Sequence, residues 1–137
     1  MIGGLVGDLL GGAVGGSIGT RLYESGRRRR LARDDRAGRP LVIPGAILGT
    51  TSYCHPRGGV LEVDGAALAW LTGRGGLRYP VPVERLTVGD VTESSDAIAS
   101  AGGWVDVHCT DGSERVTIVL PRHDLPYLAR AMPGVTG

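Results

Sequence analysis

The stretch that most restricts how this chain can fold is residues 1–20, in which glycine recurs at every fourth position. Apolar side chains occupy positions between the glycines at steps of three and four, the spacing of one helix face. A glycine at every fourth residue lets a second helix approach closely, as helices do when they associate in lipid. The glycines of this repeat, which resembles a glycine zipper, are Gly3, Gly7, Gly11, Gly15 and Gly19.

The same stretch has the length and the composition of a membrane helix. Twenty residues at about 1.5 Å each extend roughly 30 Å, the thickness of the hydrocarbon core of a bilayer. In water each glycine costs a helix about 1 kcal/mol relative to alanine, whereas in lipid the helix is the state that satisfies every backbone amide. Asp8 opposes insertion, because a carboxylate near the bilayer centre costs roughly 2.5–3.5 kcal/mol. We expect a membrane helix over residues 1–20, and a glycine-rich tail without insertion is the alternative.

Arginine dominates the residues that follow, and we interpret residues 21–40 as an arginine-rich juxtamembrane linker in which Gly26 ends the helix. Positive charge after an apolar stretch predicts that this side faces the cytoplasm. Arginines near a membrane surface are also attracted to anionic lipid, at about 1 kcal/mol each. Nucleic acid is a less favoured partner, because no aromatic side chains are interleaved to stack on bases. Four of the arginines are consecutive: Arg27, Arg28, Arg29 and Arg30.

Residues 41–137 have the pattern of one small β domain, with short apolar runs separated by glycine and proline. Two Asp-Gly pairs, at 64–65 and 111–112, each lie between apolar runs and predict tight hairpins with positive φ at both central residues. The polar residues 92–103 predict one long loop. A stripe of apolar residues after Pro121 predicts a closing helix, with Asp124 as its N-cap.

This order of elements predicts a mainly β fold of six or seven antiparallel strands closed by one C-terminal helix. We expect a small antiparallel barrel of the kind seen in pleckstrin-homology-like folds, and a sandwich with a terminal helix is the alternative. The chain contains no phenylalanine, so its core should be aliphatic around Trp70. Pro44-Gly45 is expected to form a turn after a first short strand.

The residues that most resemble a chemical site are Cys54-His55 and His108-Cys109, which hold the only two cysteines. Neighbours in a strand point to opposite faces, so such a pair does not easily deliver both ligands to one metal. Structural zinc sites space their ligands by two to four residues. We therefore expect a buried Cys109, an exposed His108, no metal, no cofactor and no catalytic residues.

Several loose motifs lie along residues 27–130: Arg27–Arg30, Cys54 with Arg57, Gly59-Val60-Leu61, Asp64-Gly65, Leu68, Trp70, Arg78 to Pro82, Val105, Val107 and Cys109. In these residues the chain resembles an uncharacterised family of short actinobacterial-type membrane proteins that is known only as a domain of unknown function. The resemblance covers roughly residues 27–130, and its motifs are loose. It implies one N-terminal membrane helix, an arginine-rich junction, a small β domain and no known activity. The family helix is rich in leucine, whereas residues 1–20 here are rich in glycine.

These observations predict a single-pass protein of the cell membrane whose C-terminal domain is cytoplasmic and acts as an interaction or scaffold module without catalytic activity. We expect the membrane, including anionic lipid, as a partner and self-association through the glycine face. The alternative is a soluble anion-binding module in which the Arg21–Arg39 tract holds nucleic acid or an acidic partner.

Overall fold

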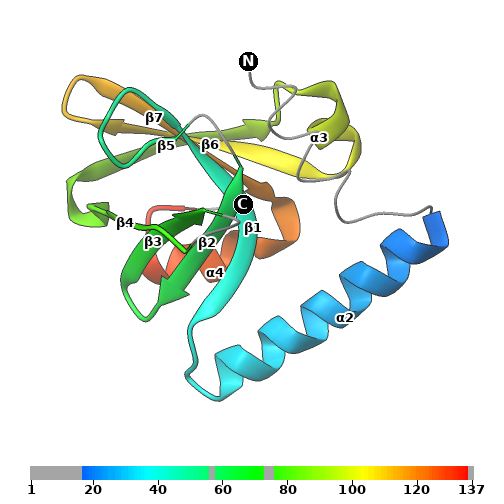
Figure 1. Cartoon of the computed structure of the whole chain (residues 1–137). Coiled ribbons are helices and arrows are strands. Elements are labelled where there is room, and N and C mark those ends of the chain that lie inside the picture. Colours follow the sequence, from blue (N-terminus) through cyan, green and yellow to red (C-terminus); the bar gives the residue numbers. More distant parts are fainter. Residues whose placement is uncertain (1–16, 56–57, 73–75, 136–137) are drawn as a thin grey trace.

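The computed structural model describes residues 17–55, 58–72 and 76–135, and its seven strands form one antiparallel sheet in the order β4-β3-β2-β1-β7-β6-β5 (Figure 1). The predicted mainly β fold with a C-terminal helix is therefore confirmed. The elements are α2 (Ser17–Arg36), β1 (Leu41–Gly49), β2 (Gly59–Asp64), β3 (Ala67–Thr72), β4 (Arg78–Val81), η1 (Val83–Arg85), β5 (Leu86–Glu93), α3 (Ala97–Ala101), β6 (Trp104–Asp111), β7 (Glu114–Pro121), η2 (Arg122–Asp124) and α4 (Leu125–Ala131).

Strand β1 joins the two halves of the sheet. Its first five residues pair with β2 and its last four pair with β7, so the ladder changes partner between Gly45 and Ala46. A Cβ atom on Gly45 would lie 2.7 Å from the Val119 carbonyl oxygen and 2.8 Å from the Leu61 side chain. Pro44-Gly45 is thus the point where the strand crosses closely over its neighbours, and the predicted turn at this pair is wrong.

The sheet is not closed into a barrel, which corrects the expected barrel form. In the described part of the chain, no ladder joins β4 to β5, although only η1 connects them. Pro80 lies within β4 and Pro82 follows it, so this edge lacks two amide donors that a closing ladder would need. The prolines explain why the sheet ends here.

The core lies on the inner face of the sheet, beneath α4. It is aliphatic as predicted, with Trp70 fully buried in it, and Leu125, Leu128 and Ala131 provide the buried side of α4. A second, smaller cluster lies on the other face, where α3 covers Ala46, Trp104 and Val119 with Ala99.

Both predicted hairpins form, but each turn lies one residue further along the chain than expected. Asp64 pairs with Ala67 and Asp111 pairs with Glu114, so each loop consists of two residues that begin with glycine. Gly65 and Gly112 have φ angles of 59° and 62°, and no described residue other than glycine has positive φ. Glycine at the first central position is the pattern of a II′ turn, in which the second residue needs no positive φ.

Residues 92–103 do not form the predicted loop. Strand β5 continues to Glu93, and Asp96 caps the short helix α3 by accepting hydrogen bonds from the amides of Ile98 and Ala99 at 2.8 and 2.9 Å. The small side chain of Ala99 lets α3 pack closely on the sheet. The polar composition of residues 92–103 gave no indication of this helix.

Helix α2 continues through Gly26, where the sequence predicted a break. One glycine costs about 1 kcal/mol, and side chains next to it dock on the β domain and compensate. No helix among the described residues is long and apolar enough to cross a bilayer. Residues 1–16 of the predicted membrane helix, with Gly3, Gly7, Gly11 and Gly15, lie outside the described residues.

Candidate functional site: the arginine face of α2

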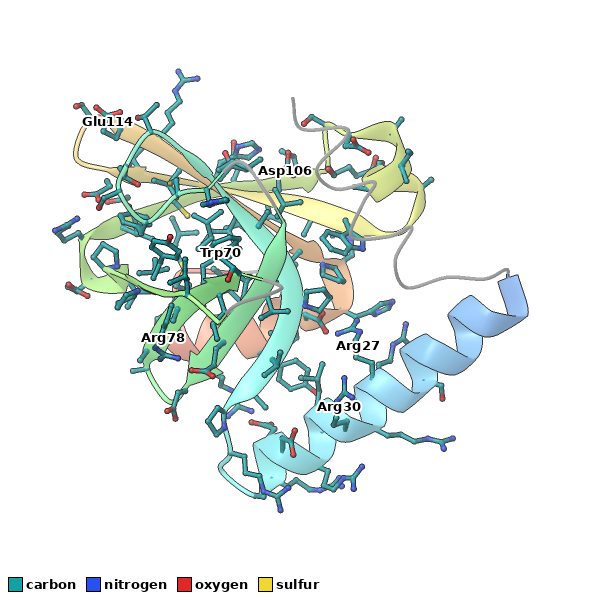
Figure 2. All side chains as sticks on the ribbon, in the orientation of Figure 1. Arg27, Arg30, Trp70, Arg78, Asp106 and Glu114 are labelled. Atoms are coloured by element: carbon teal, nitrogen blue, oxygen red, sulfur yellow. The ribbon has the colours of Figure 1, made fainter. Side chains whose placement is uncertain are left out.

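Helix α2 is attached to the β domain by a narrow stripe of side chains. Arg27 and Leu31, one turn apart, are each only 2% exposed. The Arg27 guanidinium donates from Nη1 to Asp124 Oδ2 at 2.7 Å, and Figure 2 shows Arg27 between α2 and the β domain. A second ion pair, between Arg130 Nη2 of α4 and Asp35 Oδ2 at 2.9 Å, is exposed. These contacts fix which face of α2 is turned toward the domain.

The carboxylate that receives Arg27 was predicted to cap α4. Asp124 does lie at the N-terminus of that helix, but its side chain makes no capping hydrogen bond. Both side chains of the Arg27–Asp124 pair are 1% exposed, so neither charge is solvated by bulk water. Removing one partner from such a pair typically costs about 3–5 kcal/mol, because it leaves the other charge buried and uncompensated. The pair therefore locks α2 in place.

The opposite side of α2 is a continuous cationic surface. Arg29, Arg33 and Arg36 follow one another at i, i+4 and i+7, the spacing of one helix face, and Arg28 and Arg30 flank them. All five are exposed, and within the described residues none of them has an acidic partner. The nearby acids are already engaged, since Asp34 pairs with Arg39 at 3.2 Å and Asp35 pairs with Arg130. We call these five residues the arginine face.

The structure divides the predicted cluster Arg27–Arg30 into two kinds of residue. Arg28, Arg29 and Arg30 are exposed on the arginine face, whereas Arg27 is buried in the domain interface. Sequence reasoning treated the four alike and missed Arg33 and Arg36 as members of the same surface. The helical spacing of Arg29, Arg33 and Arg36 is a signal that would have found them once the helix was extended past Gly26.

The Cys-His pairs lie in different settings. Cys109 is buried and His108 is exposed, which confirms the predicted alternation along β6. Cys54 is partly buried, with Sγ 2.9 Å from Thr51 Oγ1, and the His55 ring stacks on Trp70 with centroids 4.8 Å apart. Both cysteines are free thiols. Among the described residues, no group of three or more His, Cys, Asp or Glu side chains is arranged to hold a metal ion.

A further polar cluster joins the loop after β1 to the end of β6. The Tyr53 hydroxyl donates to Asp111 Oδ2 at 2.8 Å, and Arg85 Nη2 donates to the same oxygen at 3.0 Å. Burial of Tyr53, with the adjacent Asp111, raises the pKa of its phenol to about 12. Arg85 and then Tyr53 hold the pKa of Asp111 below its usual value. We interpret this cluster as a structural tie between the strands.

No family model, curated protein or solved structure matches the chain.

Proposed function

We propose that this protein is a membrane-anchored interaction module that binds an anionic lipid surface through the arginine face of α2 and performs no catalysis. The observation that supports this most directly is the arginine face itself: five exposed arginines without acidic partners among the described residues. Each arginine near an anionic membrane contributes about 1 kcal/mol of attraction, so five of them give substantial binding.

The position of the arginine face along α2 favours lipid over nucleic acid. Helix α2 begins at Ser17, inside the apolar stretch 1–20, and continues without a break to Arg36. Arg28 therefore follows Thr20 on the same helix by eight residues, or about 12 Å at 1.5 Å per residue. Inserting residues 1–20 in a bilayer would bring the first arginines of the face close to the lipid head groups. A nucleic-acid partner would give no reason for this continuity.

Docking of α2 gives the module a fixed orientation. Arg27 and Leu31 attach one side of the helix to the domain, so the arginine face points away from the β sheet. With residues 1–20 inserted, contact between the head groups and the first arginines of the face would hold the domain in one orientation below the bilayer and leave the sheet accessible to a cytoplasmic partner. The predicted scaffold role rests on this geometry, and self-association through Gly3, Gly7, Gly11, Gly15 and Gly19 would add to it.

Flotation of the full chain with lipid vesicles at limiting lipid tests the proposal. Vesicles with phosphatidylserine should bind more protein than vesicles of phosphatidylcholine alone, and the difference should shrink as salt rises. Replacing Arg29 and Arg33 by glutamine should weaken binding to phosphatidylserine about 30-fold, which corresponds to two charges at about 1 kcal/mol each. Flotation that survives high salt and an alkaline carbonate wash would report insertion of residues 1–20 separately.

A variant with the same change in net charge provides the control. Arg78→Gln with Arg122→Gln removes two exposed arginines from the β domain and should leave vesicle binding unchanged. Equal binding to the two kinds of vesicle at low salt would contradict the lipid function. Tight, salt-sensitive binding to RNA without any preference for phosphatidylserine would instead establish the nucleic-acid alternative.

A further inference from the structure

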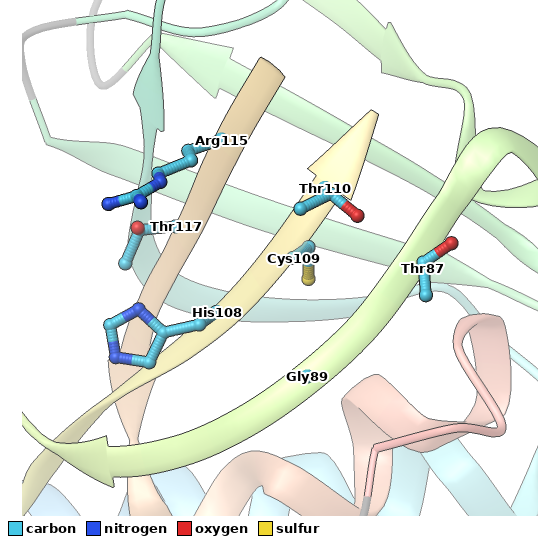
Figure 3. A pocket seen from close by; sticks show the side chains of 7 residues that line it. All are labelled: Thr87, Gly89, His108, Cys109, Thr110, Arg115 and Thr117. Atoms are coloured by element: carbon cyan, nitrogen blue, oxygen red, sulfur yellow. The ribbon is translucent and has the colours of Figure 1, made fainter. Parts of the chain in front are cut away.

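A hollow of about 270 Å³ lies on the outer face of β5, β6 and β7 (Figure 3). A β-bulge accompanies it: Val88 pairs with Cys109 and Val91 with Val107, so Gly89 and Asp90 together stand opposite His108. Bulges bend a strand and interrupt its ladder, and they often occur next to binding sites. The lining residues are Thr87, Gly89, His108, Cys109, Thr110, Arg115 and Thr117.

Cross-strand pairing brings the polar side chains of the hollow together. Thr87 stands opposite Thr110 across β5 and β6, while Thr110 stands opposite Arg115, and His108 opposite Thr117, across β6 and β7. The lining thus offers one guanidinium, one imidazole and three hydroxyls, and it contains no carboxylate. Arg115 is exposed and has no acidic partner in the described part of the chain.

The His108 ring is held in place by a neighbour on β5. Its Nε2 lies 2.8 Å from Thr92 Oγ1, within hydrogen-bond distance. When the threonine hydroxyl donates to Nε2, the proton of the neutral imidazole resides on Nδ1, which is then a donor. Cys109 borders the hollow with its backbone only, because its thiol points to the opposite face of the sheet, into the core beside Val116. The hollow is therefore rich in donors and poor in negative charge.

We propose that this hollow binds the phosphoryl group of a small molecule. A guanidinium and several hydroxyls provide enough hydrogen-bond donors to satisfy the acceptor oxygens of a phosphoryl group. A single carboxylate, with only two oxygens, would leave some of these donors unused. A volume of 270 Å³ accommodates such a group with only a few further atoms. Two acids lie nearby. Glu114 already accepts a hydrogen bond from the Thr50 hydroxyl at 2.7 Å. Asp90 lies in the bulge, and its negative charge limits the affinity of the hollow for a phosphoryl group.

This site is separate from the arginine face. Figure 2 shows Glu114, at the tip of the β6–β7 hairpin, on the opposite side of the molecule from Arg30 on α2. Binding of phosphate in the hollow and binding of lipid to α2 can therefore be removed independently. Loss of one function leaves the other as a test of whether the variant is folded.

Nuclear magnetic resonance of the full ¹⁵N-labelled chain tests the proposal with inorganic phosphate and with glycerol 3-phosphate, titrated separately. Both probes should shift the amide signals of Thr87, His108, Thr110 and Thr117. Equal affinities would show that free phosphate is the sufficient ligand, and tighter binding of glycerol 3-phosphate would show that the site takes a phosphate ester. Replacing Arg115 by methionine should weaken binding about 10-fold, as expected for loss of a charge-assisted hydrogen bond.

Matched variants make the result decisive. Arg122→Met removes an exposed arginine in η2, which follows the far end of β7, and should leave the affinity unchanged. Thr110→Val keeps the shape of the side chain without its hydroxyl and should weaken binding about 3-fold or more. The proposal is overturned if the amide signals of Thr87, His108, Thr110 and Thr117 do not shift on titration. It is equally overturned if Arg115→Met and Arg122→Met weaken binding to the same extent.

Discussion

Arg27 and Asp124 lie 97 residues apart in the sequence, yet their side chains form a hydrogen-bonded ion pair of 2.7 Å that is almost fully removed from solvent. The pair connects the arginine-rich helix α2 with the start of α4. A buried pair of this kind contributes little net stability relative to an apolar pair, but it makes the arrangement specific, because either charge alone is costly. The first prediction follows from this asymmetry.

Replacing Arg27 by methionine should lower the free energy of unfolding by about 3–5 kcal/mol, because the buried Asp124 loses the positive charge that Arg27 places 2.7 Å from it. Combining Arg27→Met with Asp124→Asn should restore much of that loss. Urea denaturation of the full chain measures the free energies, and hydrogen exchange over residues 25–36 reports whether α2 remains docked. Arg130→Met is the control, since it breaks an exposed pair whose contribution is at most about 1 kcal/mol. If Arg27→Met and Arg130→Met lowered the free energy of unfolding equally, the buried pair would not be what holds α2 on the domain.

Two glycines should respond to alanine in opposite directions. Gly26 lies within α2 and a Cβ there meets nothing within 4 Å, so Gly26→Ala should stabilise by up to about 1 kcal/mol through helix propensity. A Cβ on Gly59 would collide with the Leu71 carbonyl oxygen and lie 2.9 Å from the Trp70 ring. Gly59→Ala should therefore destabilise by about 1–3 kcal/mol. Thermal unfolding of both variants checks the signs, and a stable Gly59→Ala would disprove the close approach.

The two thiols should react at very different rates. Cys109 is 4% exposed and burial raises its pKa to about 11, so at neutral pH it is a protonated, shielded thiol. Cys54 is partly exposed. A thiol reagent should modify one cysteine in the native protein and two in urea, and Cys54→Ser should abolish the native reaction. Rapid native labelling that persists in Cys54→Ser would show that the core around Cys109 opens.

Tyr53 should make the fold sensitive to alkali. Its pKa rises from 10.0 to about 12 in the folded state, so the folded protein holds the phenol proton more tightly than the unfolded chain does. The resulting stabilisation is complete below pH 10 and is lost as the pH rises from 10 toward 12. The free energy of unfolding of the wild type should fall more steeply across this range than that of Tyr53→Phe. If the free energies of unfolding of the two proteins fell in parallel between pH 10 and 12, the pKa of Tyr53 would not be raised by folding.

Local patterns predicted those parts of the fold that depend on local physics. The alternation along β6 placed Cys109 inside and His108 outside, and the apolar stripe after Pro121 predicted α4. Trp70 was expected in the core and is fully buried. Each of these residues takes its environment from its own strand or helix, so the spacing of its neighbours carries the information.

Features that depend on distant partners were not predictable from the same patterns. Nothing near Arg27 indicates that Asp124 will neutralise it, and the residues around Asp124 favoured a helix cap instead. Pro44-Gly45 has the composition of a turn, but β1 continues through it because β2 and β7 approach from both sides. Similarly, the bulge at Gly89 and Asp90 appears only in the register of β5 against β6, and the hollow beside it could not be foreseen.

The split pairing of β1 also affects the order in which the domain can assemble during synthesis. β2, β3 and β4 pair with strands close to them in sequence, and these ladders need no residue beyond Val81. The second half of β1 cannot pair with β7 until Val116 to Val119 have left the ribosome. The ion pair between Arg27 and Asp124 can form only later, because Asp124 is synthesised after β7. Helix α2 is thus synthesised before the β strands, but its buried ion pair with the domain forms only after β7 has been synthesised. In a nascent chain the cationic helix is therefore exposed before the β domain can hold it.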